Sequence, residues 1–388
     1  KFIDVDSKKT LAEGGVEKVG LPGSFLKFKL PDGEKKTIEM PIPDHKKAIN
    51  DILNILTDPT YGCIKSFDEI NAVGHRVVHG GEKFNKSVKI DDEVIEKIKE
   101  CYDVAPLHNP ANMTGIEAIT ELMPGVPQVA VFDTAFHQTM PKEAYMYALP
   151  YELYEKYAIR RYGFHGTSHR YVSRRACDFL GLPYDKQRVI TCHIGNGGSI
   201  TAVLDGKSVD TSMGLTPVEG LMMGTRVGDV DPGALTFIMD KEHLTTKELS
   251  DLINKKSGVA GISGISSDMR DIDAAIEKGD ERAKLALDMY IYRIIKYVGA
   301  FAAVLNGVDV IVFTGGVGEN QQILRKRVCD HLTYMGVKID DEVNFSSRGE
   351  EKLISAPDSA VKVVVIPTDE ELMIARDTEA IVNGRQPE

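Results

Sequence analysis

The sequence predicts an α/β protein with two sheets and two domains. Three observations carry this prediction: two segments share one order of strands and turns, apolar strands alternate with helices, and the chain has 388 residues. Antiparallel strands followed by alternating helices and strands are typical of α/β folds. Chains longer than roughly 250–300 residues usually divide into domains.

Residues 188–213 show the repeated plan in full. Residues 189–193 predict a strand and residues 195–198 a glycine-rich loop. Residues 199–204 predict a second strand, which the turn pair Asp205-Gly206 joins to a third strand. Residues 2–5 and the segment from Thr10 onward repeat this plan without its beginning, so we expect a further strand and glycine loop ahead of Lys1.

Helices and apolar strands alternate elsewhere. Asp44 is a typical N-cap, and the apolar residues after it recur at helical spacing. Continuous apolar runs predict strands covered on both faces at residues 129–132, 308–313 and 361–366. Further helices are expected at residues 167–181, at residues 288–305, and from about residue 369 to the end.

Composition restricts the partners and the compartment. The formal net charge of −11 argues against general affinity for nucleic acid. No apolar run approaches the ~20 residues of a membrane helix. The five cysteines form no CxxC pair, and their odd number favours a reducing compartment. We therefore expect a cytoplasmic protein with no nucleic-acid or membrane partner.

Arg76 lies within an apolar strand pattern, residues 71–81. A buried guanidinium needs an anion, and its planar fork suits a carboxylate or a phosphate. A structural ion pair remains the alternative. His75 and His79 lie four residues apart on this strand, about 13 Å, which is too far for one metal ion.

Two further polar residues lie where α/β proteins bind ligands. Asp133 follows the predicted strand 129–132, and the carboxyl ends of inner strands are frequent ligand sites. An Asx turn or a helix cap is the alternative. His165 lies beside a helix N-terminus and could donate to phosphate oxygens, or be a surface histidine.

Two glycine-rich turns could bind phosphate or a nucleoside. Residues 193–198 join two antiparallel strands, where backbone N–H groups can bind an anion, although a plain hairpin is the simpler interpretation. Residues 314–320 follow a buried strand and open a helix, but Gln321 breaks the GxGxxG pattern of a Rossmann site. Glu370 lies in the first turn of the last helix, where it could complement the helix dipole or bind Mg²⁺.

The order of these motifs resembles the acetate kinase family along nearly the whole chain. The strings that carry the resemblance are residues 73–81, 105–110, 132–137, 162–169, 193–198 and 316–320. The resemblance implies an ASKHA-type fold, related to sugar kinases, Hsp70 and actin. It has two ribonuclease-H-like domains of duplicated βββαβαβα plan with a cleft between them. We expect residues 1–139 with the helix 372–388 in one domain, and residues 140–371 in the nucleotide-binding domain.

The resemblance also implies site residues. The catalytic residues would be Arg76, Asp133, His165 and Arg226. The acyl group would be bound by Arg76, Val78, Leu107, Phe164 and Pro217. The nucleotide would be bound by His193, Ile194, Gly195, Asn196, Gly197, Asp268, Met269, Arg270, Gly316, Val317, Gly318, Glu319 and Asn320. Glu370 would help to bind Mg²⁺, or Mn²⁺ in its place.

The implied reaction is reversible, Mg²⁺-dependent in-line transfer of the ATP γ-phosphoryl to acetate, giving acetyl phosphate and ADP, in a homodimer. The alternatives are propionate or butyrate as acceptor, pyrophosphate as donor, or a non-catalytic nucleotide-binding module like Hsp70 or actin. One departure stands out: the family's Asn-x-Gly-Ser-Ser-Ser-x-Lys phosphate loop does not occur near Lys1. We expect severely impaired activity if the chain is whole.

Overall fold

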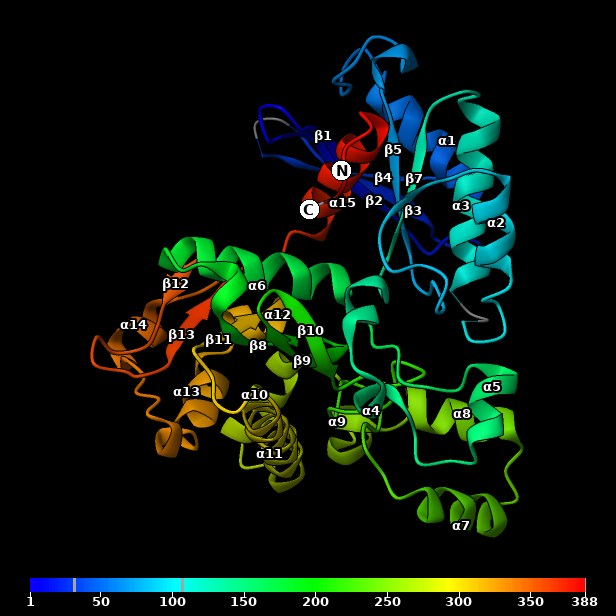
Figure 1. Ribbon diagram of the computed structural model, residues 1–388. Helices are drawn as coiled ribbons and strands as arrows, with labels where there is room; N and C mark the ends of the chain where they lie inside the picture. Colours follow the sequence, from blue (N-terminus) through cyan, green and yellow to red (C-terminus); the bar gives the residue numbers. More distant parts are fainter. Residues whose placement is uncertain (31–32, 106–107, 388) are drawn as a thin grey trace. The chain divides into compact units, whose positions relative to one another are not determined.

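The computed structural model describes residues 1–30, 33–105 and 108–387 (Figure 1). The chain forms two compact units, Lys1–Ala135 with Asp369–Glu388, and Phe136–Thr368. The division lies a few residues before the boundaries expected at 139 and 371. Residue His137 accounts for the first difference, because its imidazole bonds the Phe164 carbonyl and the Ser208 hydroxyl of the second unit.

The first unit contains two sheets. An antiparallel sheet has the order β1-β2-β3-β4 and consists of β1 (Phe2–Asp4), β2 (Lys9–Glu17), β3 (Phe25–Lys29) and β4 (Lys35–Glu39). A second sheet has the order β5-β7-β6 and consists of β5 (Val73–Val77), β6 (Val88–Lys89) and β7 (Gln128–Phe132). Strands β5 and β7 are parallel, so their carboxyl ends lie at the same edge.

Helices cover these sheets. They are α1 (His45–Leu56), η1 (Phe67–Glu69), α2 (Asp92–Lys99), α3 (Asn109–Leu122) and α15 (Glu370–Val382). Helix α15 packs on β5 and β7. Gly74 permits this contact, because a Cβ there would lie 2.5 Å from the Ile374 Cγ2 atom and from the Thr378 hydroxyl. Strands β1 and β5 line a cavity of about 1010 Å³. The further strand expected ahead of Lys1 stays a prediction.

The second unit contains one six-stranded sheet with the order β10-β9-β8-β11-β13-β12. Its strands are β8 (Arg188–Ile194), β9 (Gly198–Leu204), β10 (Lys207–Thr211), β11 (Val310–Thr314), β12 (Lys352–Leu353) and β13 (Lys362–Val365). Strands β8, β9 and β10 form the predicted antiparallel meander. Strand β11 runs parallel to both β8 and β13. These mixed sheets with packed helices confirm the predicted α/β class.

The remaining helices belong to the second unit or to its border. They are η2 (Ala135–Thr139), α4 (Lys142–Tyr145), α5 (Tyr151–Tyr157), α6 (Gly166–Leu180), η3 (Tyr184–Lys186), α7 (Pro232–Glu242), α8 (Thr246–Lys255), α9 (Gly258–Ser263), α10 (Met269–Glu277), α11 (Glu281–Val304), α12 (Gly315–Asn320), α13 (Gln322–Asp330), η4 (Thr333–Met335) and α14 (Asp341–Ser346). The start expected for α11 at residue 288 was wrong. The Asp280 carboxylate caps the helix earlier by accepting from the Ala283 N–H.

Apolar packing fixes the second sheet. Val172, Ala176 and Cys177 of α6 pack against valines of β8, β9, β11 and β13. Figure 1 shows α6 on one side of this sheet and α11 on the other. Side chains of a strand alternate between faces, so the residues of β8 that share a face with Val189 also meet α6. This alternation decides which polar groups lie under the start of α6.

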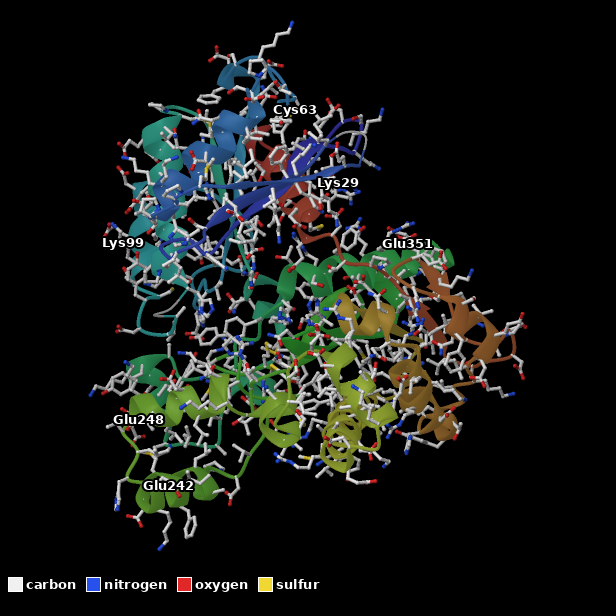
Figure 2. The ribbon with its side chains drawn as sticks, turned by 180° about the vertical axis from the view of Figure 1, so that it is seen from behind. Lys29, Cys63, Lys99, Glu242, Glu248 and Glu351 are labelled. Carbon is white, nitrogen blue, oxygen red and sulfur yellow. The ribbon has the colours of Figure 1, made fainter. Side chains whose placement is uncertain are left out.

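Many charged side chains lie on the outside of the units, whereas those of Asp133 and Arg325 are buried. Lys99, Glu242 and Glu248 are exposed examples (Figure 2). All five cysteines are free. In the described part of the chain, we find no helix that is long and apolar enough to cross a membrane.

Candidate functional site

Arg76 and Asp133 meet at the carboxyl ends of two neighbouring parallel strands. The register pairs Val77 of β5 with Phe132 of β7, and the Asp133 N–H donates to the Val77 carbonyl over 3.0 Å. Arg76 Nε donates to Asp133 Oδ1 over 3.0 Å, and Nη2 donates to Oδ2. The planar fork therefore binds the carboxylate in the bidentate way that arginine favours.

The burial of this pair differs from our expectation. The Arg76 side chain is 49% accessible rather than buried, whereas the Asp133 side chain is only 1% accessible. Within the described residues, Nη1 of Arg76 has no hydrogen-bond partner. The structural ion pair is thus present, and it leaves one edge of the guanidinium open to a second anion.

Glu370 adds a second carboxylate near this pair. Burial, followed by the charge of Asp133, raises the pKa of Glu370 to about 7, against an opposing effect of Arg76. The Oε1 atom of Glu370 is buried and has no hydrogen-bond partner among the residues that the structure describes. Burial raises the pKa of Asp133, and the Asp133 carboxylate raises the pKa of Arg76. When all three groups are ionised, this cluster carries an excess negative charge that suits a cation.

In the second unit, the site is built around the start of α6. His165 holds the N-cap position with a left-handed backbone, φ = 55°. Non-glycine residues seldom adopt this conformation, and such strain often occurs at functional sites. Gly163, also left-handed at φ = 75°, could not carry a Cβ, which would lie 2.3 Å from Thr211 Cγ2. Arg161 fixes this loop by donating to three backbone carbonyls and to Glu219.

Polar side chains of β8, β9 and α6 surround His165. Its Nδ1 bonds the Ser199 hydroxyl at 2.9 Å, and its ring stacks on His193 with centroids 4.2 Å apart. The Nδ1 of His193 in turn bonds the Ser168 hydroxyl at 2.7 Å. A Cβ on Gly197 would lie 3.8 Å from His165 Nε2 and 3.2 Å from Arg226 Nη1. The imidazole and the guanidinium thus converge beside the backbone of Gly197.

Arg226 has no counter-charge in the described part of the chain. Among the described residues, the only polar contact of its guanidinium is the Met223 sulfur, 4.0 Å away, and burial lowers the pKa of Arg226. By contrast, the buried guanidinium of Arg325 binds Asn344 and backbone carbonyls. Burying a charge costs free energy unless it is paired. A half-buried arginine without an anion therefore marks a site for an anionic ligand.

The segments expected to bind a nucleotide lie near one another. Residues 193–197 form the turn from β8 to β9, and α12 packs on β8. The Gly315 N–H at the start of α12 donates to the Glu319 carboxylate over 2.9 Å, so the helix's own side chain already satisfies this N–H group. Gln321 Nε2 donates to Asp273 of α10 over 2.5 Å, which links α12 to the helix that Asp268 caps. Arg270 pairs with Asp268 at the surface.

The expected acyl pocket remains untested. Val78 belongs to the first unit, whereas Phe164 and Pro217 belong to the second. Leu107 lies outside the described residues. Ser199, His169 and Thr191, which the structure places around His165, were missed. The alternation of β8 and β9 could have revealed two of them, since polar residues occur where the pattern predicts burial.

The family model of the acetokinase family matches residues 1–376. The chain belongs to the acetokinase family. This finding confirms the resemblance that the motifs indicated.

Curated and solved members of the acetokinase family are similar along almost their full length. Acetate kinases of Parabacteroides distasonis and Bacteroides fragilis are each 64% identical, over 99% of this chain and 96% of theirs. The crystal structure of Porphyromonas gingivalis acetate kinase is 61% identical with a TM-score of 0.95, covering 98% of this chain and 95% of that one. A propionate kinase from Francisella tularensis is 43% identical with a TM-score of 0.90, covering 97% and 94%.

A glycine substitution tests the strained loop of this acetokinase. We expect Gly163→Ala to lower the free energy of unfolding by about 2–4 kcal/mol, because left-handed strain and overpacking add. Gly181→Ala is the matched control: Gly181 is also left-handed, with φ = 68°, but no atom lies within 4 Å of the added Cβ. Gly181→Ala should lower the free energy of unfolding by only about 1 kcal/mol. Equal costs in urea unfolding would show that Gly163 is not sterically required.

A pH series tests Glu370 in the acetokinase without added metal ions. A carboxyl whose folded-state pKa is raised stabilises the protein at low pH, and this stabilisation is lost as pH rises toward 7. As the pH rises from 4.5 to 8, the free energy of unfolding of Glu370→Gln should therefore increase by about 1–3 kcal/mol relative to that of the wild type. The exposed Glu242 of the second unit gives the control Glu242→Gln, which should show no such increase. A pH-independent difference for Glu370→Gln would contradict the raised pKa.

Proposed function

We propose that the chain is an ATP:acetate phosphotransferase that forms acetyl phosphate and ADP. The observation that carries this proposal is the half-buried guanidinium of Arg226, which lacks a counter-charge among the described residues and faces Gly197 together with His165 Nε2. Two groups of this kind suit a transferring phosphoryl. Membership of the acetokinase family and the 64% identity to curated acetate kinases support acetate as the acceptor.

The chemical problem is repulsion between two anions. Acetate and the γ-phosphate of ATP are both negatively charged at pH 7. Cationic groups reduce this repulsion most effectively in the transition state, when charge spreads over the equatorial phosphoryl oxygens. In our proposal, Arg226 and His165 contact these oxygens, and Arg76 binds the acetate carboxylate or the phosphoryl group through its open edge.

Asp133 acts in this proposal by orienting Arg76. Acetate is already deprotonated at neutral pH, so the reaction needs no general base. The bidentate contact with Arg76 and the near-complete burial of the Asp133 side chain support an orienting role. Asp133 also keeps the guanidinium from rotating, which preserves its alignment with the anion.

The Glu370 cluster fits a magnesium ion. Mg²⁺ prefers one or two carboxylates together with phosphate and water. Glu370 offers a buried oxygen without a partner, and Asp133 contributes negative charge nearby. When bound, Mg²⁺ would supply positive charge to the phosphate groups. Glu370→Gln should therefore raise the concentration of Mg²⁺ required for half-maximal activity.

The nucleotide would lie against the turn of residues 193–197, helix α12 and the start of α10. In α12 and at the start of α10, the residues proposed to contact the nucleotide are Gly316, Val317, Gly318, Glu319, Asn320, Asp268, Met269 and Arg270. The contacts between these elements support this assignment, with Glu319 organising α12 through the Gly315 N–H. The acetate methyl would contact Val78, Leu107, Phe164 and Pro217. We also propose a homodimer in the cytoplasm.

Propionate is the second candidate acceptor. The structural similarity to a propionate kinase at 43% identity favours testing it. One extra methylene changes binding by only about 1–3 kcal/mol, so related pockets can accept both acids.

Substitution of the two arginines tests their roles. Arg76→Ala and Arg226→Ala should each lower kcat on the order of 10³-fold, as loss of a transition-state charge contact does. Arg175, which pairs with Glu351 away from these residues, provides the control Arg175→Ala with nearly unchanged kcat. A change in KM alone for the first two variants would contradict transition-state contacts.

A hydroxamate assay tests the reaction itself. Acyl phosphate is trapped with hydroxylamine in separate reactions containing acetate, propionate or butyrate, each with ATP or with pyrophosphate. We expect the highest kcat/KM for acetate with ATP. The proposal fails if ATP is hydrolysed without acyl hydroxamate, which would indicate a nucleotide-binding module of another kind.

A further inference from the structure

We infer that a buried chain of side chains, from Thr191 through His169 and Ser199, fixes the tautomer of His165 so that Nε2 carries the proton. The structural part of this inference stands alone, and its catalytic meaning depends on the function proposed above. We call Thr191, His169 and Ser199 the relay. They are positioning residues, since they act on the reaction only through His165.

The relay is continuous and dry. Thr191 Oγ1 lies 2.6 Å from His169 Nδ1, and His169 Nε2 lies 2.7 Å from Ser199 Oγ. Ser199 Oγ lies 2.9 Å from His165 Nδ1. Thr191, His169 and Ser199 are each 0% accessible, so water does not compete for these bonds. The first two lie on β8 and α6, and Ser199 lies on β9.

The hydroxyl of Thr191 sets the direction of the relay. Among the described residues, its only hydrogen-bond acceptor is His169 Nδ1. A buried donor left without an acceptor costs about 1–3 kcal/mol. Thr191 therefore donates to Nδ1, and His169 must carry its own proton on Nε2. The reverse direction would leave the Thr191 proton without an acceptor.

The remaining bonds follow from this start. His169 Nε2–H donates to Ser199 Oγ, and the single proton of Ser199 is then available only to His165 Nδ1. A nitrogen that accepts a hydrogen bond carries no proton of its own in a neutral imidazole. In neutral His165, the proton must therefore lie on Nε2, the atom that faces Gly197 beside Arg226.

The surroundings keep His169 neutral, as the relay requires. Burial lowers the pKa of His169 well below its ordinary value, and the nearby imidazoles of His137, His193 and His165 lower it further. Arg226 adds a positive charge on the other side of His165. The imidazoles of His137 and His193 and the guanidinium of Arg226 are thus titratable or charged groups that face the relay and His165.

The relay gives His165 an N–H donor without requiring a positive charge. An unperturbed histidine loses its second proton near pH 6.5, and free imidazole then exchanges between two tautomers. Here, the neutral ring presents Nε2–H throughout the neutral range. The Nε2–H donor of His165 is therefore still present at pH 8. Because the ring is neutral, no second positive charge lies beside Arg226 before the phosphoryl group binds.

Nitrogen NMR tests the tautomer directly. The full chain labelled with ¹⁵N-histidine is measured between pH 6 and pH 8.5 without substrates, and His165→Gln identifies the His165 signals by their loss. We expect protonated Nε2 and unprotonated Nδ1 in neutral His165 and in His169. Protonated Nδ1 in neutral His165, or a charged His165 up to pH 8.5, would overturn the inference whether or not the chain phosphorylates acetate.

Kinetics of Ser199 variants test the consequence. At saturating Mg²⁺, which keeps Glu370 ionised, wild-type kcat should vary less than about twofold between pH 6 and pH 8.5. Ser199→Ala frees His165 to exchange tautomers, so its kcat should fall several-fold above pH 7 and recover at pH 6, where the imidazolium carries both protons. Ser199→Thr, which keeps the hydroxyl, should restore the flat profile. A loss of kcat in Ser199→Ala that is equal at every pH would indicate structural damage and would reject the relay.

The two experiments also separate this inference from the proposed function. If NMR shows the predicted tautomer but the chain does not phosphorylate acetate, only the proposed function is rejected.

Discussion

The uncompensated charge of Arg226 is the constraint on which the rest of the site depends. A half-buried guanidinium that reaches only a methionine sulfur within the described part of the chain is electrostatically unfavourable until an anion arrives. The fold maintains this state through a glycine-rich loop and the turn of Gly197, where a side chain would meet the guanidinium. The cationic group is therefore already in place for a phosphate and needs no rearrangement at the moment of reaction.

Each unit positions a functional side chain through a different feature of its backbone. In the first unit, parallel pairing of β5 and β7 brings Arg76 and Asp133 to one sheet edge. In the second unit, the left-handed residue His165 at the start of α6 turns its imidazole toward the β8–β9 turn. The polar layer between α6 and the sheet then determines how that imidazole bonds. Rigid elements thus hold the functional groups, and the hydrophobic core around Val172 and Val310 supports them.

Sequence reasoning succeeded where local pattern and geometry agree. The apolar run at residues 129–132 correctly predicted a strand directly before Asp133, and the Asp205-Gly206 pair predicted the β9–β10 hairpin. It failed where tertiary contacts decide. Glu319 accepts from the Thr368 N–H, 49 residues away, and no local pattern predicts that contact. Whether Arg226 has a counter-charge likewise depends on the folded chain and not on its neighbours in sequence. The strand alternation indicates that Thr191 and Ser199 are buried polar residues, but their shared partner His169 lies on α6, which the local pattern does not reveal.

The most direct test of the central claim is a crystal structure of the chain with Mg²⁺, ADP, acetate and a fluoride analogue of the transferring phosphoryl. Our account predicts that guanidinium nitrogens of both Arg76 and Arg226, together with His165 Nε2, lie within about 3 Å of the fluorides or the acetate oxygens. It is contradicted if Arg226 contacts neither ligand, or if it instead pairs with a protein carboxylate in the complex.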